Sequence, residues 1–259
     1  MQTSYNNVVA RLELPPSKAH FAGIGGVGMA GVAFILREMG WDVSGCDIAP
    51  SHLSDWLKGL GVAVESGHSL AHASDFDSKS DMIIRTNAIP PESPEIADAV
   101  EKGLHVHLRG VLLAALSGMH DTIAVCGTHG KTTTSVFTAG ILKRLRPSES
   151  GWCIGGESPY LGAVAGGEIF DSPGKRGLFV AEADESDGTL AYYTPEVTVL
   201  NNLDFDHVEY YSDELELENT FSRMLCNTKR AIVYCADHQR ATALVQRVSS
   251  NAKRISFGF

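Results

Sequence analysis

The amino-acid sequence predicts an α/β protein in which helices alternate with the strands of mostly parallel sheets. Short apolar runs of strand length alternate with segments of helical periodicity along most of the chain. A glycine-containing loop between a predicted strand and a predicted helix occurs twice, at Gly23–Gly28 and at Gly127–Thr133. Polar, acidic segments follow two further predicted strands, at the edge where parallel sheets bind their ligands.

The first half of the chain is expected to contain five strands and three helices. Apolar residues from Met29 to Met39 recur at helical spacing, and Gly40 is placed to end that helix. Pro94 stands at a first helical position, with Gly103 just past the end of the same helix. The other expected elements are a helix near Leu53–Leu60 and strands at Ala19–Ala22, Val43–Cys46, Ala63–Glu65, Met82–Ile84 and Val106–Leu108.

The second half starts a new cycle of strand, glycine loop and helix, so a domain boundary is placed near residues 118–121. This boundary gives a first domain at 1–120 and a second at 121–259. The elements expected in the second domain are strands at Thr122–Cys126, Leu178–Ala181, Val197–Leu200, Ala231–Tyr234 and Arg254–Phe257, helices at Thr132–Leu145, Leu215–Leu225 and Arg240–Val248, and loops at 146–151 and 165–177.

Composition and charge exclude several classes of protein. The chain of 259 residues is 44% hydrophobic and 20% charged, which is a globular composition rather than a collagen-like or disordered one. Its net charge of −10 argues against nucleic acid or an anionic membrane as the main partner. The longest apolar run, near Val111–Leu116, is far shorter than the roughly 20 residues that span a bilayer. An odd number of cysteines without a C-x-x-C pair, and no secretion signal, predict free thiols in the cytoplasm.

The loop Gly23–Gly28 has the pattern G-x-G-x-x-G between a predicted strand and a predicted helix. Glycines let the backbone approach a phosphate, and the helix N-terminus supplies N–H groups. Asp47 ends the next predicted strand, where a carboxylate can accept a hydrogen bond from a ribose hydroxyl. The pattern therefore predicts nucleotide binding, without distinguishing NAD from a UDP-sugar. The alternative is a tight turn whose glycines serve packing only.

The loop Gly127–Thr133 resembles a P-loop with a shorter spacer, two residues between its glycines instead of four. In such a loop, backbone N–H groups surround the phosphates and Lys131 neutralises charge on the β- and γ-phosphate oxygens. The hydroxyl of Thr132 can coordinate Mg²⁺. The alternative is a glycine turn with an exposed lysine.

Two polar segments follow predicted strands of the second domain. Glu182–Asp187 contains four carboxylates in six residues, which repel each other unless a cation compensates, and Mg²⁺ suits their oxygen ligands. In Asn201–His207, His207 stands beside carboxylates and could bind a second metal ion or orient a phosphate. The alternatives are a solvated acidic turn and a turn capped by Asn and Asp side chains. The remaining histidines considered as ligands are interpreted as surface or packing residues: His68, His72, His105 and His107.

The four motifs, in this order, resemble the Mur ligase family over essentially the whole chain. The matching segments are residues 20–33, 124–135, 181–187 and 201–207. The resemblance implies a Rossmann-like UDP-sugar-binding domain at 1–120, followed by part of a P-loop-type central ATPase domain at 121–259. The family's third, C-terminal domain has no counterpart in this sequence. The chain is therefore expected to be a truncated product or a protein without complete ligase activity.

The resemblance is greatest to the members that join L-alanine to UDP-N-acetylmuramate, so these two substrates, ATP and Mg²⁺ are the expected ligands. It implies that ATP phosphorylates the muramic acid carboxylate and that the alanine amine attacks the acyl phosphate. The implied site residues are Lys131, Glu182 and His207 for catalysis, Thr132, Glu182 and His207 for metal, Gly127, Thr128, His129, Gly130, Lys131, Thr132 and Thr133 for ATP, and Gly23, Gly25, Gly26, Gly28, Asp47 and Arg109 for the UDP-sugar.

Three other functions are kept as alternatives. The segment at 201–207 also resembles the recycling members of the family, which join a tripeptide to UDP-N-acetylmuramate. A non-catalytic UDP-sugar-binding remnant is compatible with the missing domain. An NAD-dependent oxidoreductase would explain the first glycine loop, but it gives no role to the loop that contains Lys131.

Overall fold

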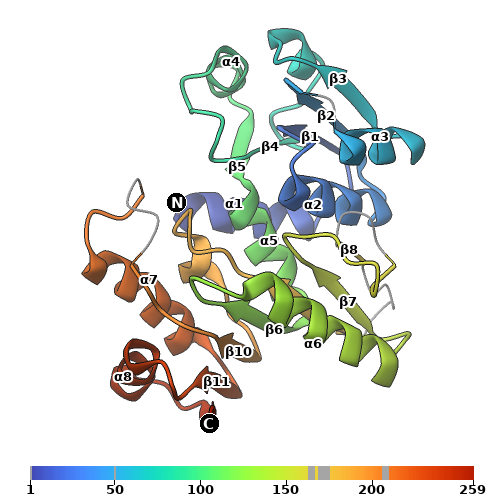
Figure 1. Cartoon of the computed structure of the whole chain (residues 1–259). Helices are drawn as coiled ribbons and strands as arrows, with labels where there is room; N and C mark the ends of the chain where they lie inside the picture. Colours follow the sequence, from blue (N-terminus) through green and yellow to red (C-terminus); the bar gives the residue numbers. More distant parts are fainter. Residues whose placement is uncertain (1, 50, 163–166, 169–175, 206–209) are drawn as a thin grey trace. The chain divides into compact units, whose positions relative to one another are not determined.

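The computed structural model describes residues 2–49, 51–162, 167–168, 176–205 and 210–259. These residues form two compact units, the first from 1–112 and 155–169 and the second from 113–154 and 170–259. The segment that starts at Gly155 therefore belongs with the first unit, although it follows the beginning of the second in the sequence. Each unit contains its own parallel sheet (Figure 1).

The first unit is built on five parallel strands. Its elements are α1 (Gln2–Leu12), β1 (Lys18–Ala22), α2 (Val27–Glu38), β2 (Asp42–Asp47), α3 (His52–Gly59), β3 (Ala63–Ser66), the 3₁₀ helix η1 (Leu70–Ala73), β4 (Met82–Arg85), α4 (Pro94–Glu101), β5 (His105–Leu108), the start of α5 (Arg109–Gly118) and the short β8 (Gly167–Glu168). The strand order β3-β2-β1-β4-β5, with the first strand in the middle, is Rossmann-like. Figure 1 shows α2 and α3 together on one side of this sheet and α4 on the other, as right-handed crossovers require.

The local signals in the sequence explain where these helices begin and end. Gly40 follows α2 with φ +88°, and Gly103 follows α4 with φ +73°, a region that glycine adopts at no steric cost. Pro94 is the first residue of α4, as predicted. Helix α3 begins at a capping box in which the Ser54 backbone N–H donates to Ser51 Oγ over 3.1 Å and the Ser51 N–H donates to Ser54 Oγ.

The second unit contains six parallel strands in the order β12-β11-β10-β6-β9-β7. Its elements, after the end of α5, are β6 (Asp121–Cys126), α6 (Lys131–Leu145), β7 (Ser150–Cys153), β9 (Leu178–Glu182), the 3₁₀ helix η2 (Thr189–Tyr192), β10 (Val197–Leu200), α7 (Glu214–Asn227), β11 (Ala231–Cys235), α8 (Gln239–Arg247) and β12 (Lys253–Phe257). The strand order reverses at β6, so the loop after β6 lies at a topological switch point, where open sheets of this type bind ligands.

The predicted fold class is confirmed, but the sequence missed some elements. The expected loop at 146–151 is wrong at its end, because Ser150–Cys153 forms the buried strand β7. The short β8 lies within the expected loop at 165–177, most of which is outside the described residues. The helices α1 and α5 were not predicted.

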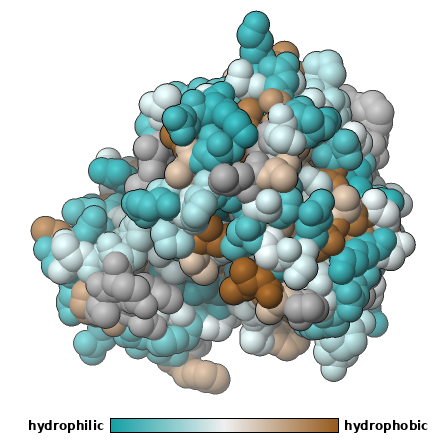
Figure 2. Space-filling view, turned by 90° about the horizontal axis from the view of Figure 1, so that it is seen from above, coloured by the Kyte–Doolittle hydropathy of each residue, from teal (hydrophilic) through white to brown (hydrophobic). Residues whose placement is uncertain are grey.

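One face of the molecule is mainly polar. Figure 2 shows one face on which hydrophilic residues predominate and hydrophobic ones occur in small separate groups. In the described part of the chain, no helix has the length and apolar character that a membrane span requires.

Candidate active site

Three of the predicted motifs meet at the carboxyl edge of the second sheet. Strand β6 lies between β9 and β10, and all three run parallel. The register pairs Val125 with Glu182 and Cys126 with Leu200. The glycine loop after β6, the acidic cluster after β9 and the polar segment after β10 therefore start at the same level of the sheet.

The loop after β6 has the backbone geometry of a phosphate-binding loop. Gly127 has φ +132° and Gly130 has φ +76°, and a Cβ at Gly127 would lie 3.0 Å from the backbone of Asn202. Helix α6 begins at Lys131, within this segment, and the N–H groups of its first turn have no acceptor within the helix. They are available to an anion in front of Lys131, which fits the phosphates of a nucleotide.

Lys131, the first residue of α6, forms a buried ion pair with Glu185 of the acidic cluster. Its Nζ lies 2.9 Å from Glu185 Oε1 and 2.8 Å from Oε2, and it also donates to the Thr128 carbonyl over 3.2 Å. Burial raises the pKa of the Glu185 carboxyl, while the Lys131 ammonium opposes that rise. The hydroxyl of Tyr211 donates to the Glu185 carbonyl oxygen. Sequence reasoning placed Glu185 in the acidic cluster but gave this residue no role of its own.

The two predicted magnesium ligands in the described part of the chain are in contact. Thr132 Oγ1 donates to Glu182 Oε1 over 2.9 Å, which joins α6 to the end of β9. A hydroxyl and a carboxylate are oxygen ligands of the kind that Mg²⁺ prefers, so this pair fits the predicted ion. The third predicted ligand, His207, lies outside the described residues.

The segment after β10 holds the Gly127–Thr133 loop in place. The His129 N–H donates to Asn202 Oδ1 over 2.8 Å, and Asn202 Nδ2 donates back to the His129 carbonyl over 3.0 Å. Thr128 Oγ1 donates to the Asp204 carbonyl and accepts from the Asp204 N–H. His238 of the N-terminal cap of α8 lies 3.3 Å from Asp204 Oδ1 and was not foreseen, because it is remote in sequence from every motif.

The predicted UDP-sugar residues of the first unit also gather at one sheet edge. The Gly25 N–H donates to Asp47 Oδ2 over 2.8 Å, and Asp47 Oδ1 accepts from the Ala49 N–H over 3.1 Å. Ser51 Oγ donates to the Gly25 carbonyl over 3.0 Å, a contact that the sequence did not reveal. Asp47 thus holds the glycine loop in its shape. The sequence predicted only a contact of Asp47 with a ribose hydroxyl.

The other predicted UDP-sugar residues lie in or beside the glycine loop after β1. Gly23 has φ +85°, and a Cβ there would lie 2.9 Å from Thr86 Cγ2, so the loop after β1 abuts the residue after β4. This is the switch point of a Rossmann-like sheet. A Cβ at Gly28 would lie 3.4 Å from the Arg109 side chain, while at Gly26 the nearest atom would be the Gly23 carbonyl oxygen, at 3.6 Å.

Comparison with protein families gives two matches that together cover almost the whole chain. The Mur ligase family, catalytic domain, matches residues 18–120, and the Mur ligase middle domain matches residues 125–259. The chain belongs to the Mur ligase family. Within this Mur ligase chain, the two glycine loops lie one in each matched region.

Individual Mur ligases with similar sequences carry the name UDP-N-acetylmuramate–L-alanine ligase. The one from Kineococcus radiotolerans is 38% identical over 251 residues, which are 95% of this chain and 50% of that relative. The one from Neisseria gonorrhoeae is 37% identical over 240 residues, 90% of this chain and 48% of that relative. The chain thus spans about half the length of the curated relatives it matches.

Solved structures of Mur ligases share the fold. The UDP-N-acetylmuramate:L-alanyl-γ-D-glutamyl-meso-diaminopimelate ligase of Neisseria meningitides superposes with a TM-score of 0.82 at 27% identity, over 94% of this chain and 78% of that one. The UDP-N-acetylmuramate–alanine ligase of Thermotoga maritima gives a TM-score of 0.76 at 28% identity, over 92% of this chain and 52% of that one.

Proposed function

We propose that this Mur ligase chain provides the UDP-sugar-binding and ATP-binding parts of an ATP-dependent ligase that joins L-alanine to UDP-N-acetylmuramate in peptidoglycan synthesis. The names of the similar relatives support the substrates. The observation that carries the chemistry is the gathering of Lys131, Thr132 and Glu182 at the N-terminus of α6. A cytoplasmic location is part of the proposal, and the five free cysteines support it.

In the second unit, the phosphate loop and the start of α6 would bind the ATP phosphates through backbone N–H groups. The Lys131 ammonium would neutralise charge on the phosphate that is transferred. Thr132 and Glu182 would hold one Mg²⁺ ion, and His207, outside the described residues, would hold a second. When bound, Mg²⁺ supplies neutralisation of phosphate oxygens, which allows an anionic carboxylate to approach.

In the first unit, the Gly23–Gly28 loop would bind the diphosphate of the UDP-sugar. The start of α2 supplies N–H groups, and the Arg109 side chain beside Gly28 supplies a local cation in an acidic chain. Asp47 and Ser51 keep the loop in one conformation through their bonds to Gly25, which lowers the entropy lost on binding.

A second candidate is the transfer of a tripeptide instead of L-alanine to the same sugar nucleotide. The high structural similarity to the Neisseria meningitides ligase supports it, because that ligase's name contains such a peptide. The two candidates share the first unit's ligand and differ only in the acceptor. A non-catalytic UDP-sugar-binding protein would keep the first site and lose the second.

Calorimetry on the whole chain tests the proposal. UDP-N-acetylmuramate and ATP with Mg²⁺ should each bind once per chain, and a folded chain that gives heat with neither ligand would contradict it. NADH should give no saturable change in fluorescence, because a nicotinamide enzyme leaves Lys131 without a role. Phosphate release that depends on the tripeptide, and not on L-alanine, would replace the first candidate by the second.

The metal site has its own test in Glu182→Gln. A neutral amide is a poorer ligand for Mg²⁺ than a carboxylate, so the Kd for ATP should rise about tenfold or more in the presence of Mg²⁺ and change little without it. Glu149→Gln, at an exposed residue after α6, is the matched control and should change neither value. Unchanged Mg²⁺ dependence in Glu182→Gln would remove the acidic cluster from the site.

A further inference from the structure

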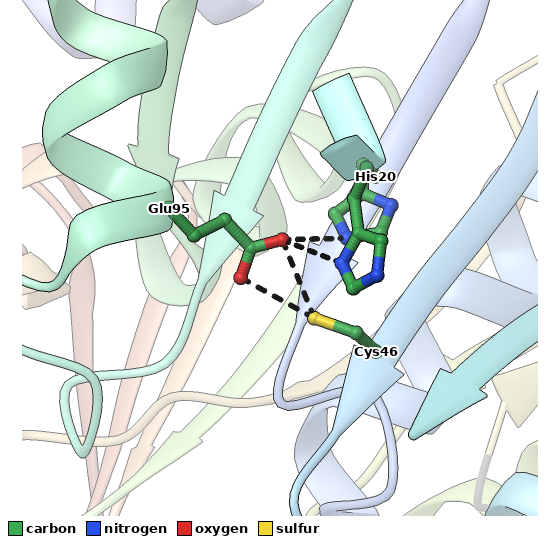
Figure 3. A group of neighbouring side chains, drawn as sticks. His20, Cys46 and Glu95 are labelled. Atoms are coloured by element: carbon green, nitrogen blue, oxygen red, sulfur yellow. Dashed lines mark hydrogen bonds and ion pairs between the residues drawn. The ribbon is translucent and has the colours of Figure 1, made fainter. Parts of the chain in front are cut away.

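Four potential metal ligands cluster inside the first unit, and neither of the ligand sites described above uses them. They are His20 of β1, Cys46 of β2, His72 of η1 and Glu95 of α4, and one donor atom from each lies within 4.8 Å of all the others. Figure 3 shows the Glu95 carboxylate directed at the sulfur of Cys46 and at the imidazole rings beside it. The sequence alone suggested only a surface or packing role for His72.

The parallel sheet brings two of the ligands onto one face. His20 is paired in register with Ser44, and Ala22 with Cys46, so His20 and Cys46 lie on the same face of adjacent strands. Helix α4 supplies Glu95 from its first turn, and η1 supplies His72. The four donors therefore come from four elements that are distant in sequence, which makes the cluster a product of the fold.

The separations that involve Glu95 are close to those of a coordination shell, and all four donor atoms lie within 4.8 Å of one another. Glu95 Oε1 lies 2.9 Å from His72 Nδ1 and 3.3 Å from His20 Nε2. Cys46 Sγ lies 3.5 Å from Glu95 Oε1 and 3.4 Å from Oε2. Adjacent ligands of a tetrahedral zinc ion, with bonds of about 2.0–2.3 Å, are separated by about 3.3–3.8 Å. Small side-chain adjustments would thus be enough to surround an ion.

The outer nitrogen of each imidazole already has a partner. His20 Nδ1 lies 2.9 Å from Ser44 Oγ, and His72 Nε2 lies 3.1 Å from Glu65 Oε2. These contacts leave Nε2 of His20 and Nδ1 of His72 directed at the cluster. Metal-binding histidines typically show this arrangement, with the far nitrogen held by a carboxylate or another polar group.

The cluster is buried in an apolar environment. The side chains of His20, His72 and Glu95 are only 1–5% exposed, and Cys46 packs with Ala22, Ile83 and other apolar residues of one core cluster. Burial and the nearby Glu95 raise the pKa of the Cys46 thiol. A divalent ion would displace that thiol proton and neutralise the resulting thiolate and carboxylate together.

We propose that His20, Cys46, His72 and Glu95 bind one divalent transition-metal ion of the zinc type. Two imidazole nitrogens, one sulfur and one carboxylate oxygen are ligands that suit Zn²⁺ or Co²⁺ and not Mg²⁺. Four protein ligands close the coordination shell, so the ion has a structural role and joins β1, β2, η1 and α4. His68 is within reach as a further donor, since its Nδ1 lies 3.1 Å from both Cys46 Sγ and Glu95 Oε2.

The whole chain, freed of metal with a chelator and then loaded with Zn²⁺ or Co²⁺, provides the test. We expect one Zn²⁺ per chain, and a Co²⁺ form with the visible absorption of a tetrahedral site and a near-ultraviolet band from thiolate to cobalt. That band distinguishes this site from the oxygen ligands Thr132 and Glu182. Cys46→Ser should remove the band, and Cys153→Ser, at another buried cysteine, should retain it.

A second variant keeps the test valid if Cys46→Ser does not fold. Glu65 is 67% exposed and holds only the outer nitrogen of His72, so Glu65→Gln should leave the fold intact by circular dichroism and weaken Co²⁺ binding about 10–100-fold. A folded parent chain that binds no Zn²⁺ above background would overturn the proposal. A thiolate band that persists unchanged in folded Cys46→Ser would overturn it as well.

Discussion

Lys131 pairs with one anion in the structure and would meet a second in the proposed function. Its ammonium is held by Glu185, and a bound phosphate would provide a further anionic partner for the same atom. Because burial already raises the pKa of Glu185, loss of the Lys131 charge would favour the protonated carboxyl over a buried unpaired anion. The pair therefore limits the structural damage that removal of Lys131 would otherwise cause.

Lys131→Ala should weaken ATP binding about 10–100-fold, because a hydrogen bond to a charged group contributes about 1.5–3 kcal/mol. Calorimetry with ATP and Mg²⁺ measures the change. The control is Arg144→Ala, which removes an exposed cation from the last turn of the same helix. If ATP affinity in Lys131→Ala stayed within twofold of the parent, the loop would not be the phosphate site.

Gly25 is required by its neighbours as much as by a ligand. A Cβ at this position would lie 2.9 Å from both Asp47 Oδ2 and Ser51 Oγ, the two atoms that bind the Gly25 backbone. Gly25→Ala should therefore displace the loop and weaken UDP-N-acetylmuramate binding at least tenfold, measured by calorimetry. Gly59→Ala is the control, since a Cβ there meets no atom within 4 Å. Equal affinities for the two variants would contradict this assignment of the loop.

Only those site residues that belong to a local sequence motif could be predicted from the sequence. Lys131, Thr132 and Glu182 follow strands in recognisable patterns, and parallel pairing explains why they meet. His72 and Glu95 lie in no common motif, and only the packing of η1 and α4 onto the sheet brings them together. Their spacing in sequence therefore gave no indication of the cluster.

At the scale of elements, strands were predicted best where alternation with helices was regular. The strand β7 was missed because Ser150–Cys153 is short, contains a glycine and is buried on both faces, so it shows no period of two. Helix α1 was missed because its sequence includes Asn and β-branched residues, which have low helix propensity. Contacts outside the helix compensate, since Arg11 lies over the Trp41 ring and donates to the Pro15 carbonyl.

Helix α1 also contacts a buried histidine of β5 that should make the first unit sensitive to acid. Ser4 Oγ lies 2.7 Å from His107 Nδ1, and burial, together with His105, lowers the pKa of His107 from its usual 6.5 to about 4. Between pH 4 and 6.5, His107 is therefore protonated in the unfolded chain and neutral in the folded chain. The stability that neutral His107 provides is therefore complete above about pH 6.5 and is lost as the pH falls to about 4.

His107→Gln should remove this part of the pH dependence, because glutamine can still bond to Ser4 and does not titrate. The parent should lose up to about 3 kcal/mol more unfolding free energy than the variant between pH 6.5 and 4. Urea unfolding at a series of pH values measures both, and His105→Gln should retain most of the parent's pH dependence, because burial, the larger cause of the lowered His107 pKa, remains. Parallel curves for the parent and His107→Gln would show that His107 does not titrate in this range.

At the scale of the whole molecule, the proposed function requires an acidic chain to bind two phosphate-bearing ligands through local features. The net charge of −10 repels polyphosphates, so each unit would use a helix N-terminus and a nearby cation, Arg109 in the first and Lys131 in the second. Both glycine loops follow the strand at which the strand order of their sheet reverses, β1 or β6. The two units thus have the same arrangement of strand, glycine loop and helix, with different side chains around it. We therefore expect the UDP-sugar to affect only the Gly23–Gly28 loop and ATP only the Gly127–Thr133 loop.

Hydrogen exchange on the whole chain can separate the two sites. UDP-N-acetylmuramate should slow exchange of the backbone N–H groups in the Gly23–Gly28 loop and the first turn of α2, because these groups would bind its phosphates. ATP with Mg²⁺ should instead slow exchange in the Gly127–Thr133 loop. With Lys131→Ala the protection by ATP should fall while that by the UDP-sugar persists, which supplies an internal control in the same molecule. Protection of the Gly23–Gly28 loop by ATP, or of the Gly127–Thr133 loop by UDP-N-acetylmuramate alone, would show that the two ligands have been assigned to the wrong units.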